Sequence, residues 1–111
     1  MRKLNTTEEV QLDLTARRLT DFDLVIGVTD DDGNDFDFTD YSGTMKVKEY
    51  FDGDALIEME VSFTTGQIAI HKDYTDMDIT PKLYKYDLRL IHNGIVDRWI
   101  YGYFTITPKV T

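Results

Sequence analysis

The sequence predicts an all-β fold: an antiparallel β-sandwich of about seven to eight strands with a C-terminal hairpin. Apolar residues occupy every second position in a series of short segments, which is the period of a strand with one buried face. Clusters of Asp, Asn and Gly separate these segments, as is usual for turns between strands. Asn93-Gly94 lies between two alternating runs, and both residue types tolerate the positive φ that a two-residue hairpin turn requires.

The N-terminal end divides into an arm and the start of the domain. Residues 1–9 are polar apart from Met1 and Leu4, and we expect a peripheral arm there, followed by a single β-sandwich domain over 10–111. Thr6-x-x-Glu9 has the spacing of a capping box, which would open a helix. We favour a strand instead, because Val10, Leu12 and Leu14 alternate with polar residues.

The next two segments surround an acidic turn. Apolar residues at alternate positions predict a strand over about 21–29. Residues 30–34, Asp-Asp-Asp-Gly-Asn, then supply turn chemistry. Phe36 and Phe38 alternate with aspartates, which predicts either a short third strand or an extended connection.

Three further alternating segments precede the hairpin. Met45 and Val47 mark a strand that ends near residues 52–54. Alternation over 57–63 is the clearest pattern of a strand with one solvent-exposed face. Thr65-Gly66 predicts a turn into a strand over 68–70. Residues 73–81 are expected to form a polar loop in which Met77 and Ile79 are embedded.

The register of the final hairpin leaves two alternatives. Counting outward from Asn93-Gly94 places Trp99 and Tyr101 on one face, opposite Leu88 and Tyr86, with Tyr84 and Tyr103 beyond them. Phe104 and Ile106 then have the opposite parity. Either a bulge at Gly102 switches the face, so that Trp99 and Phe104 share it, or the turn is longer, and Ile100, Phe104 and Ile106 face the core throughout. In the second case Trp99 points away from the core and is the best contact candidate.

Charge and composition exclude several classes of function. The chain has 111 residues and a net charge of −9. A field of that sign repels phosphate backbones unless basic residues are concentrated on one face, and no such face is visible in the sequence, so we expect no nucleic-acid partner. Arg17-Arg18 and the pair Lys46 and Lys48 are short enough to be solvated strand faces. No apolar run is long enough for a membrane span or a secretory signal, so we expect no membrane partner. The chain contains no cysteine, which removes disulfides and thiolate chemistry.

Candidate catalytic and metal-binding patterns are weak. When Gly33 is aligned with the glycine of an EF-hand loop, Val28 and Thr39 occupy the two anchor positions, and neither carries a carboxylate. His71 and His92 stand outside any metal-binding spacing, and Ser42 and Ser62 outside any nucleophile motif. We therefore expect no metal, no cofactor and no enzymatic activity.

Several short motifs, in order, resemble those of small tailed-phage virion proteins. Residues 30–33 (Asp-Asp-Asp-Gly) and 36–41 (Phe-Asp-Phe-Thr-Asp-Tyr) come first, then 65–68 (Thr-Gly-Gln-Ile) and Tyr84-x-Tyr86-Asp87-Leu88-x-Leu90. Gly102-x-Phe104-x-Ile106 and a terminal Val110-Thr111 close the series. Over about residues 10–111 the chain is similar to the N-terminal β-sandwich of phage baseplate upper proteins and to head-fibre or auxiliary capsid proteins.

The resemblance implies a non-enzymatic structural component of a phage particle, located in the virion and assembled in the host cytoplasm. Its expected partners are other virion proteins, with a homo-oligomer in the assembled particle, bound through strand edges and the arm. The candidate partner-contact residues are Leu4, Thr6, Thr7, Trp99, Tyr101 and Tyr103. The alternative function is a carbohydrate-binding module that uses Trp99, Tyr101 and Tyr103 as a stacking platform.

Overall fold

The structure, a computed structural model, describes residues 2–5, 10–50 and 53–108. These ranges contain nine strands and one short 3₁₀ helix. The strands are β1 (Arg2–Asn5), β2 (Val10–Gln11), β3 (Leu14–Arg17), β4 (Phe22–Thr29), β5 (Ser42–Lys48), β6 (Ala55–Thr64), β7 (Gln67–Lys72), β8 (Leu83–His92) and β9 (Ile95–Thr107). The helix η1 (Tyr74–Asp76) follows β7. The predicted all-β fold is confirmed. No helix in these ranges is long and apolar enough to cross a membrane.

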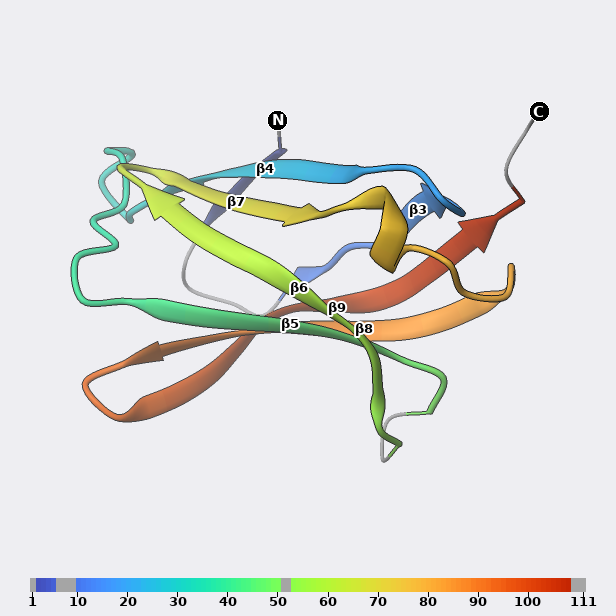
Figure 1. Ribbon diagram of the computed structural model, residues 1–111. Helices are drawn as coiled ribbons and strands as arrows, with labels where there is room; N and C mark the ends of the chain where they lie inside the picture. Colours follow the sequence, from blue (N-terminus) through green and yellow to red (C-terminus); the bar gives the residue numbers. More distant parts are fainter. Residues whose placement is uncertain (1, 6–9, 51–52, 109–111) are drawn as a thin grey trace.

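The strands form two layers that share β6. The strand order is β1-β4-β7-β6-β5-β8-β9-β2, and β3 also pairs with β9. The second half of β6 pairs with β7, whereas its first half pairs with β5. Figure 1 shows β6 passing from the layer of β4 and β7 to the layer of β5, β8 and β9. This shared strand joins the sandwich along one side.

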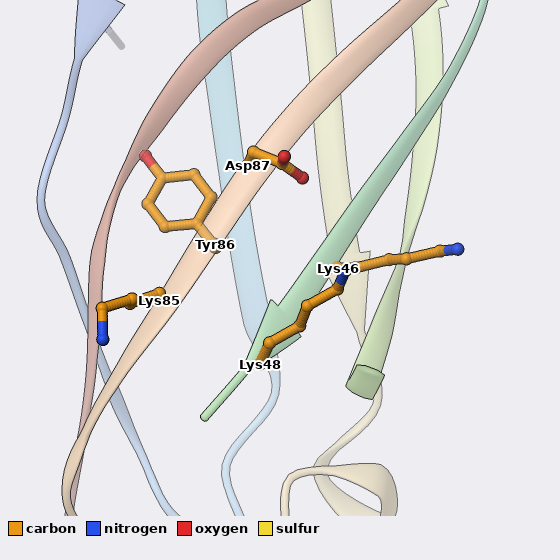
Figure 2. A pocket seen from close by; sticks show the side chains of 5 residues that line it. All are labelled: Lys46, Lys48, Lys85, Tyr86 and Asp87. Carbon is orange, nitrogen blue, oxygen red and sulfur yellow. The ribbon is translucent and has the colours of Figure 1, made fainter. Parts of the chain in front are cut away.

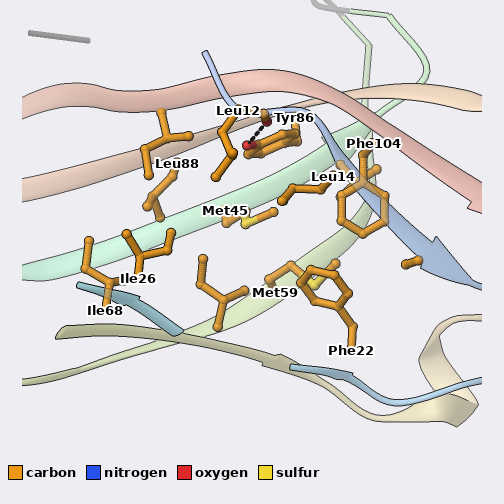
Figure 3. Packing of buried hydrophobic residues seen from close by; sticks show 14 of the residues in the cluster. Leu12, Leu14, Phe22, Ile26, Met45, Met59, Ile68, Tyr86, Leu88 and Phe104 are labelled. Carbon is orange, nitrogen blue, oxygen red and sulfur yellow. Dashed lines mark hydrogen bonds between the residues drawn. The ribbon is translucent and has the colours of Figure 1, made fainter. Parts of the chain in front are cut away.

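Alternating apolar side chains fill the space between the layers. Met45 and Val47 of β5, and Leu88 and Phe104 on β8 and β9, are fully buried. Figure 3 shows these strands directing their apolar residues toward Ile26, Ile68 and Phe22 of the facing layer. Met77, expected in a polar loop, is also fully buried, and its carbonyl accepts a hydrogen bond of 3.1 Å from the Leu19 N–H. The loop after η1 therefore closes one end of the core.

The C-terminal hairpin has the predicted two-residue turn, but its bulge lies elsewhere. Asn93 and Gly94 have φ values of 53° and 77°, and the strands pair regularly from the turn to Arg89 and Arg98. Leu88 then pairs with Ile100, so Trp99 is the extra residue. The predicted bulge at Gly102 is therefore wrong, and so is the longer turn.

The position of this bulge decides which aromatic residues are buried. Beyond it, Ile100, Phe104 and Ile106 are all buried, as expected for a core-facing strand. Tyr86 pairs with Gly102 and Tyr84 with Phe104, and both tyrosines are in the core. Because Tyr101 and Tyr103 have the other parity, the predicted single face of tryptophan and tyrosines does not form.

Gly102 has a different role, which is to let the N-terminal segment cross β9 closely. A Cβ at this position would lie 2.5 Å from the Leu12 carbonyl oxygen. The Leu12 N–H donates to the Tyr101 carbonyl at 2.9 Å, and the Tyr86 hydroxyl donates to the Leu12 carbonyl. The Tyr103 N–H donates to Asp13 Oδ1 at 3.1 Å. Leu12 and Asp13 thus interrupt the predicted first strand and separate β2 from β3, both parallel to β9.

One other segment differs from the prediction, and another takes one of the two predicted forms. Residues 2–5, expected in the arm, form β1, which pairs in parallel with β4 and places Leu4 opposite Val28. Thr6, Thr7 and the capping-box pair lie outside the described residues. Phe36 and Phe38 belong to an extended connection, in which an isolated bridge joins Thr29 and Asp35.

Candidate docking face

The outer surface of β5, β8 and β9 carries three rows of long polar and aromatic side chains. In the strand registers, Lys48 pairs with Lys85, and Lys85 pairs with Tyr103. The other two rows are Lys46–Asp87–Tyr101 and Thr44–Arg89–Arg98. We call these nine residues the basic face, because five of them are cationic and one is a carboxylate.

Strand alternation explains why these residues share a surface. Lys46 lies between Met45 and Val47, which are completely buried. Lys85 lies between Tyr84 and Tyr86, which are 3% exposed. Because successive side chains point to opposite sides of a strand, burial of the apolar set turns the charged set outward.

Specific contacts organise the basic face. The Arg89 Nε donates to Asp87 Oδ2 at 3.0 Å, and the Asp87 side chain is only 19% exposed. The guanidinium carbon of Arg98 lies 4.6 Å from the centre of the Tyr101 ring, within the range of a cation–π contact. A small hollow between β5 and β8 is lined by Lys46, Lys48, Lys85, Tyr86 and Asp87 (Figure 2).

Two carboxylates flank the basic face at its margins. Glu58 of β6 is the register partner of Lys46, and Asp13 lies beside Tyr103 through its hydrogen bond to the Tyr103 N–H. The centre of the face nevertheless carries an excess of positive charge in a chain whose net charge is −9. This arrangement can bind a surface that is acidic and that offers contacts to tyrosine rings.

The predicted contact residues are divided by the structure. Tyr101 is half-buried and Tyr103 is 42% exposed, and both lie on the basic face. Leu4 lies on β1, in the other layer. The sequence predicts Lys46 and Lys48 only as a short pair on a solvated strand face, and it does not predict the larger basic face. Their alternation with buried residues was the available signal, but only the strand order brings Lys85, Arg89 and Arg98 beside them.

Trp99 belongs to a separate aromatic cluster at one end of the sandwich. Its ring lies 5.4 Å from Phe36 and 6.1 Å from Phe38, measured between ring centroids. Phe38 also packs against Phe63 at 5.0 Å, and Tyr41 stacks on His92 at 4.2 Å. Trp99 is half-buried against the core. It therefore does not join Tyr101 and Tyr103 in a single stacking platform.

The opposite layer carries an acidic row centred on a histidine. Asp23, His71 and Glu60 are register partners across β4, β7 and β6. The His71 Nδ1 lies 2.6 Å from Asp23 Oδ1, and Nε2 lies 2.7 Å from Asp73 Oδ1. Hydrogen bonds to Asp23 and then Asp73 raise the pKa of His71 to about 9. The histidine is therefore positively charged at neutral pH, and the three carboxylates around it outnumber that charge.

The acidic turn after β4 is built by its own backbone. Asp30 Oδ1 accepts hydrogen bonds from the N–H groups of Asp32 at 2.9 Å and Asn34 at 3.0 Å. Gly33 has a φ of 82°, a left-handed conformation that glycine adopts at no steric cost. Within residues 2–5, 10–50 and 53–108, no group of three or more His, Asp or Glu side chains is arranged to hold a metal ion.

Comparisons with known proteins identify a shared fold. No protein-family model matches the sequence, and no curated protein matches it either. Among solved structures, the chain is similar to the N-terminal domain of phage TP901-1 ORF48, with a TM-score of 0.54 and 13% sequence identity. That match covers 94% of this chain and 93% of the other. A second similar structure is the Lin-41 filamin domain, with a TM-score of 0.49 and 17% identity over 84% of this chain and 82% of the other. The chain thus shares its fold, over nearly its whole length, with a domain of a phage protein.

Proposed function

We propose that this protein is a non-enzymatic structural module of a phage particle that docks on neighbouring virion proteins. The observation that carries this proposal is the fold shared with the N-terminal domain of phage TP901-1 ORF48 across almost the full length of both chains. Its position on the particle is a head fibre, an auxiliary capsid site or a tail or baseplate assembly. The virion is accordingly its proposed location.

Surface features of the sandwich support a docking role. The basic face presents charged and tyrosine side chains on a rigid sheet, and rigid tyrosines are enriched at protein interfaces. At the other layer, β1 pairs with β4 only, so its outer side is a strand edge among the described residues. Strand edges bind partners through backbone hydrogen bonds. The proposed docking routes are therefore the basic face, this edge and the N-terminal residues.

Purified particles of the phage that encodes this chain provide the test. We expect the protein to remain with the particles through high-salt washing and gradient sedimentation. In a map of the intact particle, a two-layer sandwich of 45 × 29 × 21 Å should contact a different virion protein. Truncation of residues 1–9 should lower incorporation if the N-terminal residues contribute. Absence of the chain from washed particles, with free chain recovered from the lysate, would reject the proposal.

A carbohydrate-binding module is the second candidate. The observation in its favour is that Tyr101 and Tyr103 lie two residues apart on the same outward-facing side of β9. Trp99 makes no part of that surface, because it packs against Phe36 and Phe38. A glycan array on the wild type and on a Tyr101→Ala/Tyr103→Ala variant separates the two functions. Binding of a glycan by the wild type and its loss in the variant would favour carbohydrate recognition.

A further inference from the structure

Charge is segregated between the two outer surfaces of the sandwich. The basic face has Lys46, Lys48, Lys85, Arg89 and Arg98 against one carboxylate, Asp87, in its three rows. These cations are five of the twelve Lys and Arg residues in a chain that has 21 Asp and Glu residues. Most of the acidic charge must therefore lie elsewhere on the molecule.

The outer surface of the other layer, which we call the acidic face, has the opposite character. Its first row, Asp23–His71–Glu60, is extended by Asp73. The carboxylate-bearing side chains of Asp23, Glu60 and Asp73 are each about two-thirds exposed, at 69%, 67% and 66%. The acidic face therefore carries net negative charge in contact with solvent.

Side-chain size also differs between the two surfaces. The next rows of the acidic face are Val25–Ala69–Ser62 and Gly27–Gln67–Thr64. Apart from Gln67 their side chains are short and form a low surface, which ends at β1, where Lys3 is the register partner of Gly27. The basic face instead presents lysine, arginine and tyrosine. Long side chains on one face can therefore lie across the low surface of the other, with opposite charges meeting at one side.

The area of the two faces suits a protein interface. The molecule measures 45 × 29 × 21 Å. A surface that spans its two longer dimensions is larger than the roughly 800 Å² that one partner contributes to a standard stable interface. A second copy can cover such a face without any change in fold.

We propose that the basic face of one copy binds the acidic face of a second copy. Because the two surfaces differ, the contact is heterologous, and repetition gives a ring or an open stack rather than a closed pair. The second copy is then one partner of this protein in the phage particle, and this biological setting rests on the proposed function. The net charge of −9 on each copy opposes association at long range, so the local charge match decides its strength and orientation.

Analytical ultracentrifugation of the full chain tests the self-association. We expect species larger than the monomer to increase with protein concentration. Raising the salt concentration from about 50 mM to about 500 mM should weaken association by about tenfold or more, because contacts between exposed charges are screened over a Debye length of a few ångströms at the higher value. A single monomeric species at all concentrations up to about millimolar would overturn the inference, since affinities weaker than this give no stable complex.

Charge-reversal variants of each face test whether the basic face and the acidic face form the contact. Lys48 and Lys85 are register partners and so already form a like-charged pair. Lys48→Glu/Lys85→Glu keeps a like-charged pair at these positions but reverses its sign. Asp23→Lys/Glu60→Lys reverses the acidic face. Each variant alone should be monomeric, and an equimolar mixture should associate, because the first variant keeps the native acidic face and the second keeps the native basic face. Association of either variant alone at wild-type strength would reject the assignment.

One further variant controls for net charge, and another tests the low surface by steric block. Asp31→Lys/Asp32→Lys makes the same change in net charge as the acidic-face variant, but in exposed positions of the turn after β4, and should self-associate at least as well as the wild type. Ala69→Arg adds a long side chain to the low surface and should block the contact while every residue of the His71 row is kept. Circular dichroism should be used to check that each variant is folded. Retention of a monomeric protein by virions would reject this inference and leave the proposed function standing.

Discussion

Replacing Tyr86 by phenylalanine should loosen the attachment of the N-terminal strands to β9. The Tyr86 side chain is 3% exposed, and its hydroxyl donates to the Leu12 carbonyl. The substitution keeps the ring, which lies 6.2 Å from the ring of Phe104, and removes only the donor. A buried acceptor left without its donor costs about 1–3 kcal/mol.

The expected change in melting temperature follows from the size of the chain. An unfolding entropy of about 2.1 cal/mol/K per residue gives roughly 0.23 kcal/mol/K for 111 residues. The loss of about 1–3 kcal/mol therefore corresponds to a decrease of about 4–13 °C, measured by circular dichroism or calorimetry. Tyr103→Phe is the matched control, because Tyr103 is 42% exposed on the same hairpin and should melt close to the wild type. Equal melting temperatures for both variants would refute the role assigned to the Tyr86 hydroxyl.

Three other predictions concern the same sandwich. Gly102→Ala should destabilise the fold by about 1–3 kcal/mol in urea unfolding, because its Cβ would meet the Leu12 carbonyl oxygen at 2.5 Å; an unchanged midpoint would contradict this close approach. The pKa of His71 is raised from 6.5 to about 9 on folding, so its charge stabilises the fold fully below pH 6.5, and this contribution is lost as the pH rises through about 9. His71→Asn should therefore melt below the wild type by the largest margin under pH 6.5, and this margin should shrink above about pH 9. A margin that does not change with pH would contradict the stabilising charge on His71. Trp99→Ala should cost about 1–3 kcal/mol, since half-buried packing against Phe36 is lost; a loss below about 0.5 kcal/mol, the level of ordinary surface substitutions, would place Trp99 outside the packed cluster.

Local patterns in the sequence were sufficient to predict most strands and one turn. Asn93-Gly94 forms the expected turn because its requirement for two positive φ values is local. Met45, Val47, Ile57 and Met59 are buried as their alternation predicted, since a period of two puts them on one side of a strand. The acidic turn at 30–34 is likewise built from its own side chains and backbone.

The bulge was misplaced because two non-local contacts determine it. Gly102 looked like the residue of a bulge, yet the absence of its side chain is needed where Leu12 crosses β9. Trp99 takes the extra position, and its ring packs against Phe36 and Phe38 from a connection more than sixty residues earlier. Neither contact is visible in the alternation of the hairpin itself.

The candidate site shows the same division between local and tertiary information. That Lys46, Lys85 and Arg89 point away from the core is a local consequence of alternation with buried residues. That they form one face is a consequence of strand order, because β8 lies between β5 and β9. The sequence by itself therefore determined the fold class, the hairpin turn and the buried parity of most strands. Only the tertiary structure decided the bulge at Trp99, the break at Leu12 and Asp13, and the separation of charge onto two faces, because each depends on which distant strands become neighbours.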